Sequence, residues 1–146
     1  MKKLLMLFMT IASLQAFSQV KISGILGYEY NNQKNTWSPN VVGKESSAVD
    51  GSGNQTLIVV KLNRIPGAEY KYINRKLKIT AQNESQGKLV KVFEQRELIV
   101  PIVEETFFVP FIIQQGATGI TIKAELYEGE KLVSTKKQFL LTWSGD

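Results

Sequence analysis

Carboxylates, hydroxyls and amines are the reactive side chains of this sequence, because histidine and cysteine are absent. The commonest general base, the thiol nucleophile and the usual transition-metal ligands are therefore missing, and a Ser-His-Asp triad cannot be built. Serine and lysine are plentiful, but their spacing marks out no Ser-Lys dyad. The sequence predicts no catalytic residue, no metal ligands and no cofactor, and we expect that the protein is not an enzyme.

Paired carboxylates and calcium ligands are the chemistry that remains to be considered. Glycoside hydrolysis needs two carboxylates across a cleft, and the candidate pairs are Glu94 with Glu97 and Glu104 with Glu105. Adjacent residues of a strand face opposite ways, so the second pair is better explained as a solvated connector. In the stretch DGSGNQ (50–55), Asp50, Ser52 and Asn54 have the spacing of the first oxygen ligands of a calcium-binding loop. However, Gln55 stands at the position of the turn glycine of such a loop, and Lys61 stands at the position of its bidentate glutamate. A glycine-rich turn explains these residues better.

The densest basic stretch, KLNRIPGAEYKYINRKLK (61–78), combines lysine and arginine with two tyrosines. Charge and stacking on such a segment can hold an anionic polysaccharide or a lipid headgroup. The candidate binding residues are Lys71, Tyr72, Arg75 and Lys76. The alternative is a solvated strand face, because in RKLKITAQ (75–82) the lysines alternate with apolar residues.

The stretch FFVPFII (107–113) is apolar on both sides of its predicted strand. On an extended strand one set of side chains can fill a core, and the opposite set then lies on an outer face. The first set is Phe107, Val109, Phe111 and Ile113, and the outer set is Phe108, Pro110 and Ile112. Proline has no N–H group, which marks an edge strand or a bulge.

Three ways in which this outer set could be shielded from solvent are considered. The long polar loop at 31–55 could fold over it, with Trp37 or Val41 and Val42 as the lid. The strand could instead pass from one sheet to the other, or a partner protein could bind there. Coverage by the chain itself is expected first and a partner second, because intramolecular burial orders no second chain.

Period-two hydrophobic patterns fill the chain after residue 19, and no segment carries a helical stripe. Strands are predicted at 20–30, 56–62, 75–82, 88–94, 97–103, 106–113, 120–128 and 131–143, the last two as a hairpin around Gly129-Glu130, and residues 40–42 are a candidate edge strand. Seven or eight such strands favour an all-β, antiparallel β-sandwich of immunoglobulin-like or fibronectin-like architecture. A small closed β-barrel is the alternative.

Two of these strands carry specific predictions about their faces. The strand at 56–62 is apolar on both sides and is expected to be central and buried. In the strand at 20–30 one face is expected to hold Val20, Ile22, Leu26, Tyr28 and Tyr30, with Ile25 as an exception.

The first residues, MKKLLMLFMTIASLQAFS (1–18), have the charged, apolar and small-residue regions of a secretory signal peptide. Cleavage is expected before Gln19, and the apolar run is shorter than the roughly 20 residues of a membrane span. Residues 19–146 are then one β-sandwich domain without disulfides. Without cysteine it is not a lipoprotein, and no transmembrane segment is expected after cleavage.

These features predict an exported protein of the periplasm, the cell surface or the extracellular space. Export makes nucleic acid an unexpected partner despite the formal charge of +5. The leading function is a non-catalytic binding or assembly accessory protein, which meets a cell-envelope protein through an apolar edge patch near 107–113. The patch comprises Phe108, Pro110, Ile112 and Trp37. The alternatives are an anionic-surface or carbohydrate-binding module using 61–78, and an adhesin or fibre subunit in which an edge strand accepts a strand from the next molecule.

Overall fold

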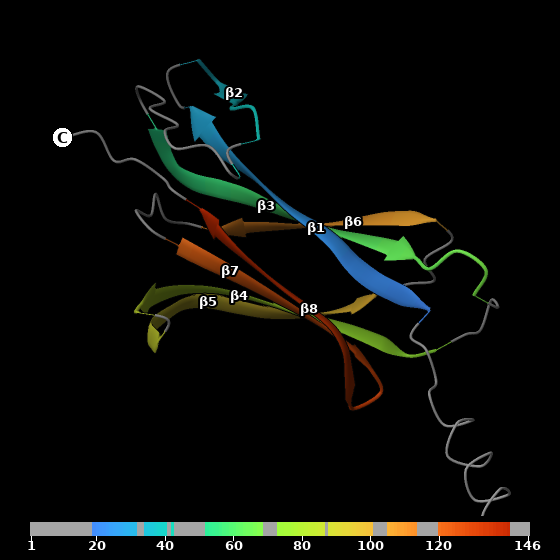
Figure 1. Ribbon diagram of the computed structural model, residues 1–146. Helices are drawn as coiled ribbons and strands as arrows, with labels where there is room; N and C mark the ends of the chain where they lie inside the picture. The colour runs from blue at the N-terminus through green and yellow to red at the C-terminus, as the bar shows by residue number, and fades with distance from the viewer. Residues whose placement is uncertain are drawn as a thin grey trace, which may run out of the picture.

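The computed structural model describes residues 19–31, 34–40, 42, 52–68, 73–86, 88–100, 105–113 and 120–140, and these form two antiparallel four-stranded sheets packed face to face (Figure 1). The predicted β-sandwich is confirmed. No strand pairing among the described residues joins the two sheets, so the alternative closed barrel is not formed. The predicted signal peptide lies outside the described residues.

Each sheet takes strands from both halves of the chain. The first sheet has the order β2–β1–β3–β6, with β1 at Val20–Asn31, β2 at Thr36–Trp37, β3 at Ser52–Arg64 and β6 at Thr106–Ile113. The second sheet has the order β5–β4–β7–β8, with β4 at Arg75–Ser85, β5 at Lys88–Val100, β7 at Ile120–Glu128 and β8 at Lys131–Leu140. In constant-type immunoglobulin domains the fourth strand joins the first sheet. Here the fourth long strand, β5, pairs with β4 instead, which is the fibronectin-like arrangement.

The core lies between the sheets and consists of alternate residues from their inner faces. The inner face of β4 contributes Leu77, Ile79 and Ala81, and that of β7 contributes Ile120, Ile122, Ala124 and Leu126, all of them fully buried. The inner face of β3 contributes Ile58, Val60 and Leu62. Its outer residues Leu57 and Val59 are half-buried, so the expectation that both faces of this strand are buried was wrong.

A β-bulge in β1 overturns the predicted faces of that strand. Ile22 pairs with Leu62 but Gly24 pairs with Lys61, so one extra residue, Ser23, shifts the alternation. The Ser23 hydroxyl fixes this shift by donating to the Lys61 carbonyl oxygen at 3.1 Å. Beyond the bulge Ile25, Gly27 and Glu29 are buried, and Leu26, Tyr28 and Tyr30 turn to the outer face.

Strand β5 is continuous where the sequence predicted separate strands at 88–94 and 97–103. Gln95 and Arg96, the predicted connection, pair regularly with Thr80 and Ile79, and two bulges at Phe93 and Val90 lie within the first predicted strand. Strand β2 was also placed wrongly, because the short edge strand of the long loop is at Thr36–Trp37 and not at 40–42. The hairpin around Gly129-Glu130 is confirmed, and Gly129 has the positive φ that its two-residue turn requires.

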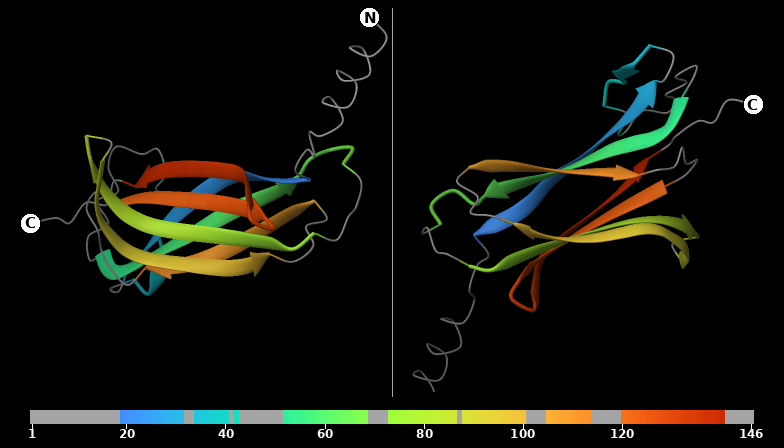
Figure 2. Two further views of the ribbon diagram at one scale, coloured as in Figure 1. Left: turned by 90° about the horizontal axis from the view of Figure 1, so that it is seen from below. Right: turned by 180° about the vertical axis from the view of Figure 1, so that it is seen from behind.

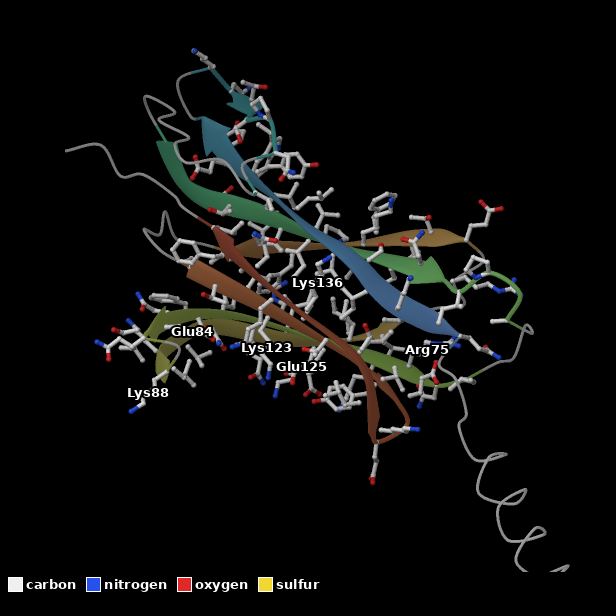
Figure 3. The ribbon with its side chains drawn as sticks, in the orientation of Figure 1. Arg75, Glu84, Lys88, Lys123, Glu125 and Lys136 are labelled. Atoms are coloured by element: carbon white, nitrogen blue, oxygen red, sulfur yellow. The ribbon has the colours of Figure 1, made fainter. Side chains whose placement is uncertain are left out.

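Side chains close the edge of the sandwich where β1 lies next to β8. The Ser134 hydroxyl accepts from the Ile22 amide at 3.0 Å, and the Lys136 ammonium group donates to the Ser23 carbonyl at 2.9 Å (Figure 3). Further along β1, Asn40 and Ser38 accept from the amides of Gly27 and Glu29. These bonds occupy donors that an added strand would otherwise use.

Candidate functional site

The outer side of β6 carries the candidate residues that the sequence singled out. Phe108 and Ile112 keep 52% and 39% of their surface exposed, and Pro110 is also exposed. Val109, Phe111 and Ile113 are buried on the inner side. The alternation predicted for β6 is therefore confirmed, and its outer set is exposed rather than covered by other described residues.

Neighbouring strands extend these residues into a larger apolar surface. Three rows cross the first sheet in register: Tyr28–Leu57–Ile112, Leu26–Val59–Pro110 and Gly24–Lys61–Phe108. We call the side chains of Leu26, Tyr28, Leu57, Val59, Phe108, Pro110 and Ile112 the outer apolar face. Exposed apolar surface that spans several strands often marks a protein-binding site.

Trp37 does not act as the predicted lid over β6. It pairs with Tyr30 at the opposite edge of the sheet, with ring centroids 5.1 Å apart, and remains partly exposed. Val42 packs against the core cluster, and Val41 lies outside the described residues. Phe108 and Ile112 stay exposed and neither Trp37 nor Val42 covers them, so the expected coverage is not found within the described residues.

Two lysines border the outer apolar face at the Phe108 end. The Lys61 ammonium group lies 5.8 Å from the centroid of the Phe108 ring, and Lys21 is exposed on the same side of β1. Neither lysine forms an ion pair within the described part of the chain. The described strands place no acidic side chain on this face, since Glu29 points inward and is buried.

The outer face of the second sheet carries paired charges. Its lysines meet glutamates across and along the strands, in the pairs Lys76–Glu97 at 3.2 Å, Lys123–Glu125 at 2.7 Å and Lys137–Glu84 at 2.7 Å (Figure 3). The hydrogen bond from Lys137 lowers the pKa of the Glu84 carboxyl group, which keeps this carboxylate charged. This sheet therefore pairs several of its outer charges and also exposes Ile99, Leu132 and Phe139, whereas Lys21 and Lys61 on the first sheet form no ion pair within the described residues.

The basic and tyrosine segment is not assembled into a described binding surface. Lys71 and Tyr72 lie outside the described residues. Arg75 is buried, and its guanidinium group donates to Glu128 and to the Gln19 side chain, each at 3.1 Å. Lys76 is exposed but is held by Glu97 and lies over the Tyr127 ring. The buried position of Arg75 weighs against its role as a ligand for anions.

The acidic residues considered as reactive groups are not brought together within the described part of the chain. No group of three or more acidic side chains among the described residues is placed to hold a metal ion. An open hollow of about 490 Å³ lies at the end of β3 and is lined by Asn63, Arg64, Ile65, Pro66, Gly67, Glu105 and Thr106. Glu94 forms an ion pair with Arg96 at 3.0 Å rather than facing Glu97. Asp50 and Glu104 lie outside the described residues.

Comparison with known proteins gives no relative from which a function could be transferred. No family model matches the chain, and no curated protein matches it. Among the described residues there is no helix long and apolar enough to cross a membrane.

Proposed function

We propose that this protein is an exported, non-catalytic binding or assembly subunit of the bacterial cell envelope, and that its outer apolar face binds a partner protein. The observation that carries the proposal is the outer apolar face itself, which crosses three strands in register. Phe108, Pro110 and Ile112 are exposed on it beside leucine, valine and tyrosine side chains, and the lysines at its border form no ion pair within the described residues. Contact with a partner would remove this apolar surface from water.

The chemistry of the face favours a different protein over a second copy of this chain. Lys21 and Lys61 border it, and the described strands supply no acidic side chain there to neutralise the lysines of a facing copy. A partner with an apolar surface and a carboxylate near the Phe108 end would satisfy both features. Electrostatic complementarity of this kind sets the orientation and the association rate of a complex.

The alternative of a fibre subunit, in which an edge strand accepts a strand from another molecule, has less support. Pro110 removes a backbone donor from β6, and side chains take several donors of β1. On β5, Glu94 and Arg96 pair with the inward-facing Ala81 and Ile79, and the Arg96 guanidinium lies 5.4 Å from the centroid of the Phe111 ring. Inward-pointing charges, prolines and bulges are devices that prevent strand addition.

Replacing both Phe108 and Ile112 by serine tests the proposal. Burying these two side chains contributes on the order of 3–5 kcal/mol by area transfer, so partner affinity should fall by roughly a hundredfold or more. The measurement is quantitative mass spectrometry of the proteins that the tagged variant and the tagged wild type retain in their own cells.

A matched control is the double replacement of Leu132 and Phe139, which are similarly exposed apolar residues on the outer face of the second sheet. It should keep the partner that the Phe108→Ser, Ile112→Ser protein loses. An unchanged set of retained proteins and an unchanged oligomeric state for both double variants would refute a binding role for the outer apolar face.

A further inference from the structure

The joined ends of β4 and β5 form an arm that extends beyond the rest of the second sheet. Pairing of β4 with β7 ends at Gln82, whereas pairing of β4 with β5 continues to Ser85 and Lys88. We call β4 residues 83–85 and β5 residues 88–92 the β4–β5 arm. In both views of Figure 2 these ends curl away from the sandwich. Within the described part of the chain the arm is a two-stranded ribbon, because no third strand pairs with β4 beyond Gln82, whereas a third strand usually supports such a pair.

Neither face of this arm is covered by other described residues, and its apolar side chains are exposed. All five residues from Lys88 to Val92 are exposed; Leu89 and Val92 pair with Glu84 and Gln82, which share one face of β4, and Val90 is the bulge residue between the two pairs. Leu89 and Val90 keep 58% and 64% of their surface exposed, and Val92 keeps 43%. They do not belong to the core cluster, so packing within the fold does not account for their hydrophobicity.

The charges of the arm are predominantly basic. Lys88 points away from the sandwich at the end of the arm (Figure 3), and Lys91 lies 5.2 Å from the centroid of the Phe93 ring. Neither has an acidic partner within the described residues. The carboxylate of the arm, Glu84, is already held by Lys137 at 2.7 Å. Two lysines are thus left beside three exposed apolar side chains.

We propose that the β4–β5 arm inserts into the surface of a lipid bilayer that contains anionic lipids. Neither face of the arm is covered by the rest of the described chain. The interfacial region of a bilayer can surround both faces of such an apolar tip, whereas a flat surface of a partner protein would bury only one of them. The three residues from Gln82 to Ser85 extend about 10 Å at 3.3 Å per residue, comparable to the roughly 5–10 Å depth of interfacial insertion. Lysines next to the inserted residues attract anionic headgroups. This site is separate from the outer apolar face and does not depend on the proposed function.

Flotation of the purified full-length processed protein with lipid vesicles tests this inference. Vesicles of phosphatidylglycerol and phosphatidylethanolamine should bind the protein, and pure phosphatidylcholine vesicles should bind it much less. Added salt should weaken the binding because it screens the lysines. The Leu89→Ser, Val90→Ser variant should bind anionic vesicles at least about tenfold more weakly, because its apolar contact with the lipid is lost. The Lys88→Glu, Lys91→Glu variant should lose the preference for anionic vesicles.

The matched control is Ile99→Ser with Leu132→Ser, which removes two exposed apolar side chains at the opposite end of the same sheet and should leave binding unchanged. A Val90→Trp variant should show a blue shift of tryptophan emission with anionic vesicles, reporting insertion independently of affinity. Far-UV circular dichroism checks that every variant is folded. The inference is overturned if no vesicle binds the wild type, if folded Leu89→Ser, Val90→Ser protein binds as well as wild type, or if the arm crosslinks to a protein while no vesicle binds.

Discussion

Replacing Phe111 by alanine is expected to destabilise the protein by about 3–5 kcal/mol, the usual cost of truncating a large aromatic side chain in a packed core. Phe111 is 1% exposed on the inner side of β6, pairs in register with Ile58, and lies beneath the Arg96 guanidinium. A typical domain has about 5–15 kcal/mol of stability, so this loss should shift a urea unfolding midpoint strongly at an unchanged slope.

Phe108 is the matched control, because it is the same residue type three positions earlier on the opposite side of β6. Its truncation to alanine should cost about 1 kcal/mol or less, since it is half-exposed and its ring contact with Lys61 is a surface contact. Similar losses for both variants would show that the two faces of β6 are not assigned correctly.

Replacing Arg75 by methionine should also destabilise the protein by about 3–5 kcal/mol, because it removes one partner of a buried ion pair. The Arg75 and Glu128 side chains keep 3% and 13% of their surface exposed, and 3.1 Å separates Nε from Oε1. The Glu128 carboxylate would lose this cation while it remains largely buried. Equilibrium denaturation of single and double variants measures the effect.

Two comparisons separate this effect from simple loss of packing. Adding Glu128→Leu to Arg75→Met should recover much of the lost stability, since an apolar pair can replace a buried ion pair at little cost. Lys76→Met removes the neighbouring ion pair, in which both partners are 47% exposed, and should change stability by about 1 kcal/mol or less. The buried ion pair would be contradicted if the loss of stability in the Arg75→Met, Glu128→Leu variant equalled the sum of the losses in the two single variants. It would also be contradicted if Lys76→Met destabilised the protein as much as Arg75→Met.

The architecture could be predicted where the strands are regular. In β4 and β7 apolar residues recur at every second position, and a period of two assigns them to the core without knowledge of their neighbours. The hairpin at Gly129 could be predicted because a two-residue turn requires a positive φ that glycine adopts easily. These signals are local, so a single sequence contains them.

The rest depends on contacts between residues far apart in the sequence. The bulge in β1 is held by Ser23 and the Lys61 carbonyl, and nothing near Ser23 announces it. The period-two pattern therefore predicts Leu26 and Tyr28 on the inner face, and the apolar run of β3 predicts burial of its outer side. For this reason the β6 part of the outer apolar face could be predicted, and the β1 and β3 parts could not. Burial of Arg75 was missed for a similar reason, because its partner Glu128 is on another strand.

Site-specific photo-crosslinking in the native cell tests the central claim most directly, namely that the outer apolar face binds another protein. A photoreactive amino acid at position 108 reports contacts of this face, and one at position 132 reports contacts of the opposite outer face. We predict that position 108 crosslinks to one dominant protein and that this protein does not crosslink to position 132. Absence of any crosslinked protein from position 108, or the same products from both positions, would contradict the account.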